Sequence, residues 1–214
     1  MILLTTNSKL QKESGYTIMG LNLAPHKVSG YNVCPHAGAC AEVCIGEHSG
    51  FMKMPNVRQS QVRKTKLFFE DRSLFLSQLH SDLETLSQKD NPACRLNVDS
   101  DIPWELIDKT LFDYPITYYD YTKNPRRVQK YIDGELPANY YLTYSYSEKS
   151  DKAQVNKFLK AGANVNVVFS IQYISKSLLP LPSSLKINTK EWEVVDADLH
   201  DLRIPEMDGS GVIT

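Results

Sequence analysis

The sequence lacks the features that mark a nucleic-acid-coating, membrane-spanning or secreted protein. Its formal net charge is -1 and its pI about 6.5, so charge indicates no nucleic-acid partner. No stretch approaches the roughly 20 apolar residues that span a bilayer. The apolar run at the N-terminus is too short for a signal peptide. We therefore expect one domain, residues 1–214, in the cytoplasm and without a membrane partner.

Familiar catalytic motifs are also missing. The sequence contains no P-loop, no G-x-G-x-x-G, no H-E-x-x-H and no G-x-S-x-G pattern, and it has no internal repeat. These absences disfavour nucleotide hydrolysis, nicotinamide chemistry and the common hydrolases. Any chemistry must therefore come from a less familiar arrangement of side chains.

Strand-like and helix-like segments alternate along most of the chain. Apolar residues at helical spacing predict two helices over 56–71 and 72–88, and further helices are expected over 103–113, 124–132 and 148–162. Strands are expected over 15–25, 93–98, 115–121, 138–147 and 163–170, with one more from Trp192 onward. Such alternation predicts an α/β fold, either a partial (β/α) barrel, which we favour, or an open, mainly parallel sheet. In both, sites gather at the carboxyl ends of the strands.

Cysteine is scarce, but three of the four cysteines lie together after the first of these parallel strands. "NVCPHAGACAEVC" (32–44) holds Cys34, Cys40 and Cys44 in a C-x5-C-x3-C spacing. A reducing cytoplasm disfavours a disulfide, and thiolates are soft ligands suited to zinc and iron-sulfur clusters. Three free thiols in a small hydrophobic loop are the simplest alternative, but so dense a group is improbable by chance.

The choice of metal depends on a fourth ligand. Zinc usually shows paired C-x2–4-C spacings and a closed shell, which would have to be completed by His36, His48 or the distant Cys94. Three cysteines without a fourth instead suit a 4Fe-4S cluster with one open iron, where a substrate or cofactor can bind. Cys94 lies at the start of an expected strand and is predicted to belong to the core.

Polar residues gather where the expected strands end, and seven of them are predicted to line a catalytic pocket beside the cluster. An acidic group there can bind a hydroxyl, a cation or an amine. Alternatively, Asp101 or Ser100 caps the following helix, and the basic residues after Lys123 form a solvated helix face. The predicted pocket residues are Asn97, Asp99, Asp101, Asp120, Lys123, Ser145 and Glu148.

A second polar segment, "DADLHDLRIPEMD", lies near the end of the sequence. It contains Asp198, Asp201 and Arg203, which are candidates for binding a cofactor through magnesium or phosphate. A self-satisfied network of ion pairs is the alternative. The sequence alone leaves both open.

Two resemblances follow from these residues. Three cysteines in the loop after the first strand of a β/α barrel resemble the radical S-adenosylmethionine (SAM) enzymes in architecture, although the usual spacing there is C-x3-C-x2-C. The chain is also similar, over most of its length, to the bacteriophage family called "gene product eighty-eight". The matching segments are "LNLAPHKVSGYNVCPHAGACAEVC", "VRQSQVRKTKLFFEDRSLFLSQL", "RLNVDSDIPWE", "YYDYTKNPRR", "YYLTYSYSE" and "VVDADLHDLRIPEMDGSGVI". Members usually continue past the last segment, so the C-terminus is expected to be truncated or naturally shorter.

Three functions from different classes remain. The first is a radical-SAM-like enzyme that binds SAM at the open iron and acts on an unknown substrate in the host cytoplasm. The second is a redox or sensing protein with a non-cysteine fourth ligand, such as His36, His48 or a carboxylate, and a host electron donor. The third is a zinc-stabilised binding module.

Overall fold

A computed structural model describes the chain except for residues 9, 12–14, 49–53, 170–172, 175–176 and 179–180. Its centre is a six-stranded sheet in which β2 to β6 lie in chain order and run parallel, while β1 pairs with β2 in the antiparallel direction. The strands are β1 (Leu4–Thr5), β2 (Thr17–Leu21), β3 (Pro92–Arg95), β4 (Thr117–Thr122), β5 (Tyr140–Ser145) and β6 (Val165–Asn166). The predicted α/β fold is confirmed as an open, mainly parallel sheet that is not closed into a barrel.

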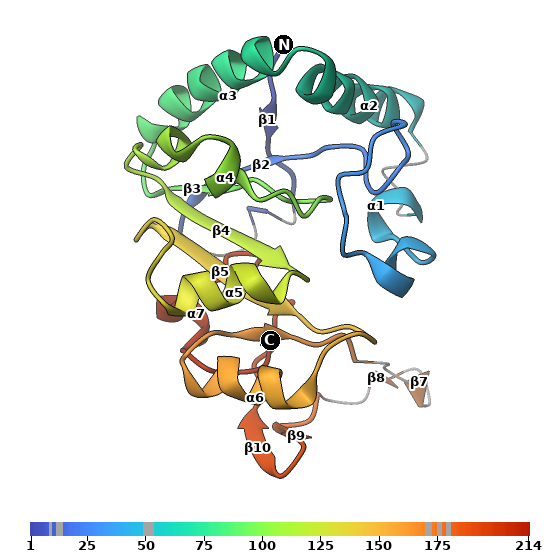
Figure 1. Cartoon of the computed structure of the whole chain (residues 1–214), viewed down its shortest axis with the longest axis vertical. Helices are drawn as coiled ribbons and strands as arrows, with labels where there is room; N and C mark the ends of the chain where they lie inside the picture. Colours follow the sequence, from blue (N-terminus) through green and yellow to red (C-terminus); the bar gives the residue numbers. More distant parts are fainter. Residues whose placement is uncertain (9, 12–14, 49–53, 170–172, 175–176, 179–180) are drawn as a thin grey trace.

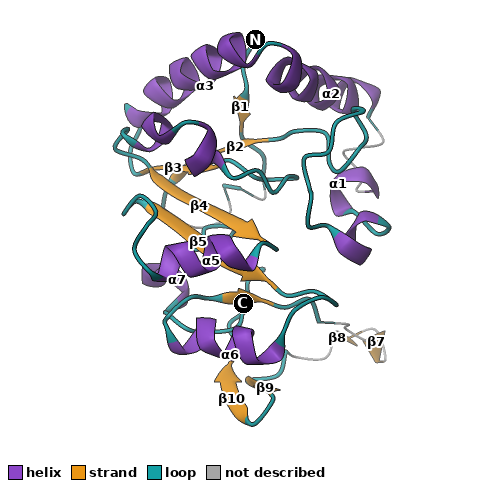
Figure 2. Cartoon of the chain, in the orientation of Figure 1, coloured by secondary structure: helices purple, strands orange, loops and turns teal. Residues whose placement is uncertain are grey.

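The connections between the parallel strands are mostly helical (Figures 1 and 2). The longest helices, α2 and α3, lie at the same end of the molecule as the N-terminus, whereas α6 lies at the opposite end. The helices are α1 (Ile45–His48), α2 (Pro55–Glu70), α3 (Arg72–Ser87), α4 (Trp104–Ile107), α5 (Pro125–Ile132), α6 (Lys152–Lys160) and α7 (Pro205–Asp208), with short 3-10 helices η1 (Gly38–Ala41) and η3 (Lys109–Phe112).

Helices α2 and α3 cover the sheet with faces of different chemistry. Helix α3 buries Phe75, Leu79, Leu83 and Leu86, as its leucine spacing predicts. Helix α2 instead buries a largely polar row, namely Gln61, Lys64, Thr65 and Phe68, while its valines are only half-buried. The polar row holds the N-terminal part of the chain: the Lys64 ammonium donates to the Leu3 carbonyl at 2.6 Å, and the Thr65 hydroxyl accepts from the Ala24 N–H.

Local end signals place several helix boundaries correctly. The Asn124 side chain accepts from the Arg126 N–H and begins α5, and Gly162, with φ +91°, follows the end of α6. The helix predicted over 103–113 is divided, because Asp108 is extended and its side chain begins η3 instead. The expected cap from Ser100 or Asp101 is wrong: Pro103 precedes α4 and provides no side-chain cap.

The opposite face of the sheet is covered by the C-terminal segment. Leu202 and Ile204 pack against Ile18, Ala93 and Tyr119 there. Cys94 follows Ala93 on β3 but belongs to a different core cluster, the one that contains the buried leucines of α3. It is completely buried, as predicted.

The last predicted strand forms outside the main sheet. Strand β10 (Lys190–Glu193) pairs in an antiparallel hairpin with β9 (Ser184–Ile187), and β7 (Tyr173–Ile174) pairs in the antiparallel direction with β8 (Ser177–Leu178). Ile213 forms parallel bridges with Val165 and Val194, which brings the chain end beside β6. In the described part of the chain, every helix is too short or too polar to cross a bilayer.

Candidate functional site

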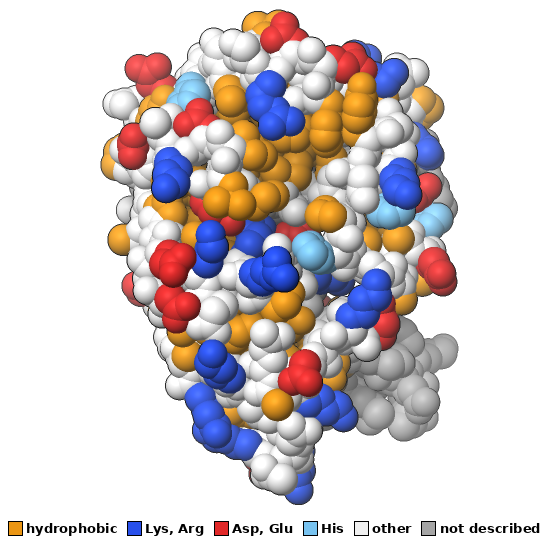
Figure 3. Space-filling view, viewed as in Figure 1, with side chains coloured by type: hydrophobic (Ala, Val, Ile, Leu, Met, Phe, Trp, Pro, Cys, Tyr) orange, Lys and Arg blue, Asp and Glu red, His pale blue; other side chains and the backbone are white. Residues whose placement is uncertain are grey.

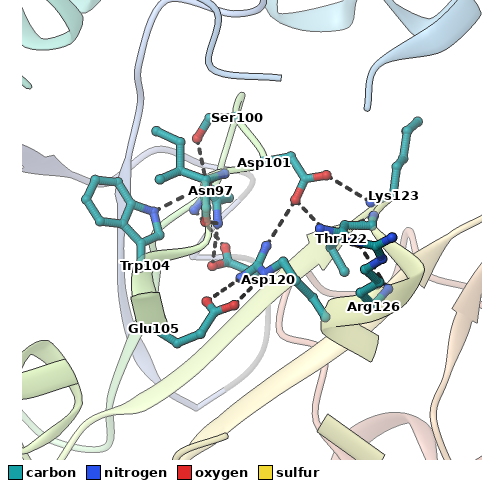
Figure 4. Close-up of polar contacts among 12 residues, drawn as sticks. Asn97, Ser100, Asp101, Trp104, Glu105, Asp120, Thr122, Lys123 and Arg126 are labelled. Atoms are coloured by element: carbon teal, nitrogen blue, oxygen red, sulfur yellow. Dashed lines mark hydrogen bonds and ion pairs between the residues drawn. The ribbon is translucent and has the colours of Figure 1, made fainter. Parts of the chain in front are cut away.

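A buried set of polar side chains lies at the carboxyl ends of β3 and β4 (Figure 4). Asp120, on β4, is fully buried and accepts hydrogen bonds from the Asn97 backbone N–H at 2.7 Å, the Asn97 amide at 2.9 Å and the Tyr140 hydroxyl at 2.7 Å. Asn97 also accepts from the Ile102 N–H and the Trp104 indole. Burial raises the pKa of Asp120 to about 6, against these hydrogen bonds, which favour its charged form.

Arg127 joins this set to two more carboxylates. Its guanidinium binds both oxygens of Glu105 at 2.9 Å and one oxygen of Asp101 at 3.0 Å, and it donates to the Tyr140 hydroxyl at 2.8 Å. The side chains of Arg127 and Glu105 are only 4% exposed. The expected solvated face is therefore wrong for Arg127, although Arg126 is exposed.

Asp101 completes the set by holding the end of β4. Its two oxygens accept from the Thr122 hydroxyl at 2.7 Å and the Lys123 backbone N–H at 3.0 Å. Thus both oxygens of every carboxylate in this set accept hydrogen bonds from protein groups. We call Asn97, Asp101, Glu105, Asp120, Arg127 and Tyr140 the carboxylate network.

The three cysteines lie beside this network. The cysteine loop, residues 32–44, is on the side toward which the arrowheads of β4 and β5 point in Figure 1. The Val33 carbonyl accepts from the Asp101 N–H at 2.9 Å, and the Cys34 thiol donates to the Asp99 carbonyl at 3.5 Å. The predicted position of the cysteines, at the carboxyl ends of the parallel strands, agrees with these contacts.

Two glycines around the cysteines fit closely against carboxylates from strand ends. A Cβ atom at Gly38, whose φ is +57°, would lie against a side-chain oxygen of Glu148, which also accepts from the Ala39 N–H at 2.9 Å. A Cβ atom at Gly46 would lie 2.8 Å from a side-chain oxygen of Asp99. The loop and the start of α1 are therefore held against the segments that follow β3 and β5.

The thiols differ in their surroundings. Cys40 is exposed, whereas Cys34 and Cys44 are half-buried. Burial raises the pKa of Cys34 to about 11, with smaller upward contributions from nearby Asp101, Cys44 and Cys40, and burial also raises the pKa of Cys44. Burial is thus the main cause of the raised pKa at both thiols, and the neighbouring cysteines add to it.

Two further predicted residues lie on the neighbouring strand ends. The Lys123 side chain points away from Asp101 (Figure 4), and its ammonium donates to the Ser145 hydroxyl at 3.0 Å. The Ala39 N–H, and to a smaller extent the positive charge of Lys123, lower the pKa of the exposed Glu148. Lys123, Ser145 and Glu148 thus connect the ends of β4 and β5 to the cysteine loop.

Gln61 is a site residue that sequence reasoning missed. It is 5% exposed on α2, and its amide donates to the Asp99 carboxylate at 3.4 Å. Its amide oxygen has no hydrogen-bond partner among the described residues. Gln61 lies on the same face of α2 as its apolar residues, and this position is the signal in the sequence that could have identified it. The helix prediction rested on the valines instead.

The second polar segment forms a network of its own. Asp201 is bound by the Arg95 guanidinium at 2.9 Å and by the Tyr119 hydroxyl at 2.7 Å, and Arg203 pairs with Asp208 at 2.7 Å. Asp198 is exposed. The contacts of Asp201 and Arg203 accord with the ion-pair alternative, since they hold the C-terminal segment against the sheet.

The positions of the possible metal ligands limit which metal ion or metal cluster this region could bind. Among the described residues, no three His, Cys, Asp or Glu side chains converge closely enough to hold one metal ion. Both His36 and His48 are exposed. The ligands of an iron-sulfur cluster bind different iron atoms and therefore need not meet at one point.

Together these features define an open, mainly parallel α/β protein with a cysteine-bearing loop at the carboxyl edge of its sheet. The family model described as Gene product 88 matches residues 1–213, so the chain belongs to that family, as its sequence segments predict. No curated protein and no solved structure matches the chain significantly. The resemblance to radical SAM enzymes gains no support from these comparisons.

Proposed function

We propose that this protein binds a 4Fe-4S cluster through Cys34, Cys40 and Cys44 and leaves one iron without a cysteine ligand. The observation that carries this proposal is that Asp99 and Glu148, which follow two different strands, both contact the cysteine loop. Three thiols, two of them half-buried, then lie where ligands and substrates bind in parallel α/β proteins. When bound, such a cluster supplies electron transfer and a Lewis-acidic iron.

The structure supports different roles for the predicted pocket residues. The carboxylate network would keep the strand ends rigid beneath the loop, because its oxygens are already bound within the protein. Lys123 and Ser145 would lie beside the ligand of the open iron, and Glu148 would either contact that ligand or bind the iron itself. Gln61 would offer its buried amide oxygen to a donor group on the same side as Asp99.

Two occupants of the open iron fall within this proposal. SAM would make the protein a radical-SAM-like enzyme acting on an unknown substrate. Glu148 would instead make it a redox or sensing protein that accepts electrons from a host donor in the cytoplasm. The contact between Glu148 and the Ala39 N–H, next to Cys40, favours Glu148 as the first residue to test.

The deciding experiment is iron, sulfide and zinc analysis with an absorption spectrum on protein purified without oxygen. We expect brown protein with iron and sulfide in equal amounts. Cys34→Ala, Cys40→Ala and Cys44→Ala should each abolish cluster binding, whereas Cys94→Ala, which changes a fully buried thiol, should retain it. Colourless protein with one zinc per chain would overturn the proposal and favour the zinc-stabilised binding module.

The occupant can then be distinguished on cluster-loaded protein. If Glu148 is the ligand, Glu148→Ala and Glu148→Gln should both change the spectrum, although Gln keeps an acceptor for the Ala39 N–H. If SAM is the ligand, adding SAM should change the spectrum of the unaltered protein, and SAM should be cleaved under strong reductant.

A further inference from the structure

A pocket of about 360 Å³ lies between α4, η3, α5 and the turn that follows α5. None of its lining residues was singled out as a site residue in the sequence. On the face shown in Figure 3, lysine and arginine side chains lie among hydrophobic ones over α4 and α5. The lining residues are Glu105, Leu106, Lys109, Lys130, Glu135, Leu136 and Pro137.

The charged side chains that line this pocket differ in whether they form ion pairs. Both oxygens of Glu105 are engaged by Arg127, so this carboxylate is not available to the lysines. Within the described ranges, no carboxylate lies within 4.0 Å of the ammonium group of Lys109 or Lys130. Two unpaired cations therefore line the pocket, opposed by the exposed Glu135 alone.

The rest of the lining is apolar and accessible. Leu106 is 64% exposed, although it belongs to a helix whose neighbouring residues Trp104 and Glu105 are buried. Leu136 and Pro137 add apolar surface from the turn after α5. Small-molecule sites have volumes of roughly 300–1,000 Å³ and combine an apolar lining with a few polar anchors. The volume of this pocket lies in that range, and its lining combines three apolar residues with four charged ones.

We propose that the pocket binds a small amphipathic organic anion, in which a carboxylate lies between Lys109 and Lys130 and a short apolar chain contacts Leu106 and Leu136. Lys109, on η3, and Lys130, on α5, both line the pocket, so an anionic group bound in it would lie in the field of two positive charges. The apolar chain covers the exposed leucine, which provides the favourable burial. This site is independent of the cysteine loop.

A matched pair of probes tests the proposal by NMR on the whole chain. Octanoate and octanol have the same chain length and differ in charge. Octanoate should shift the methyl signals of Leu106 and Leu136 in a saturable manner, and octanol should bind at least tenfold more weakly. Equal affinities, or octanoate shifts confined to other methyl groups, would overturn the proposal.

Charge variants separate a specific site from general attraction to lysines. The double variant Lys109→Gln and Lys130→Gln should weaken octanoate binding about tenfold, to the level of octanol. The control, Lys152→Gln with Lys160→Gln, removes the same charge from exposed positions of α6 and should leave the affinity unchanged. Leu106→Ser should weaken both probes. An equal loss of octanoate binding in the two lysine pairs would contradict the site.

Discussion

The carboxylate network and the cysteine loop adjoin each other at the carboxyl edge of the sheet, but their polar groups are satisfied to different degrees. In the network, Asp101, Glu105 and Asp120 are bound through both oxygens by groups of the same chain. In the loop, one cysteine is exposed and two are half-buried. A saturated network stabilises the fold, whereas groups left accessible remain available to a ligand.

The largest expected effect comes from breaking the network at Arg127. Arg127→Met leaves Glu105 and Asp101 buried beside a group that cannot compensate their charges, and removing one partner of a buried pair costs about 3–5 kcal/mol. Denaturant unfolding should therefore show a much lower midpoint for this variant. Arg126→Met is the matched control, since Arg126 is exposed and its loss should change the stability by less than about 0.5 kcal/mol. Similar losses in the two variants would show that the network contributes little.

Asp120 gives the stability of the carboxylate network a pH dependence in the acidic range. Burial raises the pKa of Asp120 to about 6, from an ordinary value near 4. Between these values the folded protein retains a proton that the unfolded chain has released, so the contribution of Asp120 to stability falls as the pH rises through this window. At about 1.4 kcal/mol for each of the two units, the change across the whole window is about 3 kcal/mol.

The comparison variant is Asp120→Asn, which cannot titrate. Its free energy of unfolding should lack this fall when measured by chemical denaturation at about pH 4.5 and 6.5. At about pH 6.5 the variant should also be less stable than the unaltered protein, because the Asn97 N–H loses a charged acceptor there. Parallel pH profiles for the two proteins would rule out Asp120 as the titrating group.

Local signals explain which features could be predicted from the sequence. The parallel strands, the helices on either side of Asp71 and the ends of helices at Asn124 and Gly162 follow from periodicity and capping, which involve near neighbours in the chain. The clustering of Cys34, Cys40 and Cys44 was also visible, because spacing is a property of the sequence itself.

The features that could not be predicted from the sequence depend on contacts between residues that lie far apart in the chain. Arg127 appeared to belong to a solvated helix face, and only the tertiary fold brings Glu105 to it. Gln61 reaches Asp99, and Glu148 reaches Ala39, across stretches of chain that carry no periodic signal linking them. Helix α2 likewise buries a largely polar row, although the spacing of its apolar residues predicted that these would form the buried face.

The smallest expected effect tests the cysteine loop through Gly38. Gly38→Ala places a side chain at φ +57° and displaces Glu148 from the Ala39 N–H. The strained backbone costs about 1–2 kcal/mol locally, and the loop should loosen. We expect the loop thiols to react several-fold faster with a thiol reagent in protein prepared without metal, while Cys94 stays unreactive because it is fully buried.

Gly134→Ala supplies the control for this loosening. Gly134 has a similar φ of +72°, but a Cβ atom there would meet nothing within 4 Å. This variant should have a comparable backbone cost without a change in thiol reactivity. If both variants react at the rate of the unaltered protein, the contact with Glu148 does not hold the loop. A faster reaction for Gly38→Ala alone would show that the change acts within the cysteine loop and not through a general loss of stability, because the backbone cost is comparable in both variants.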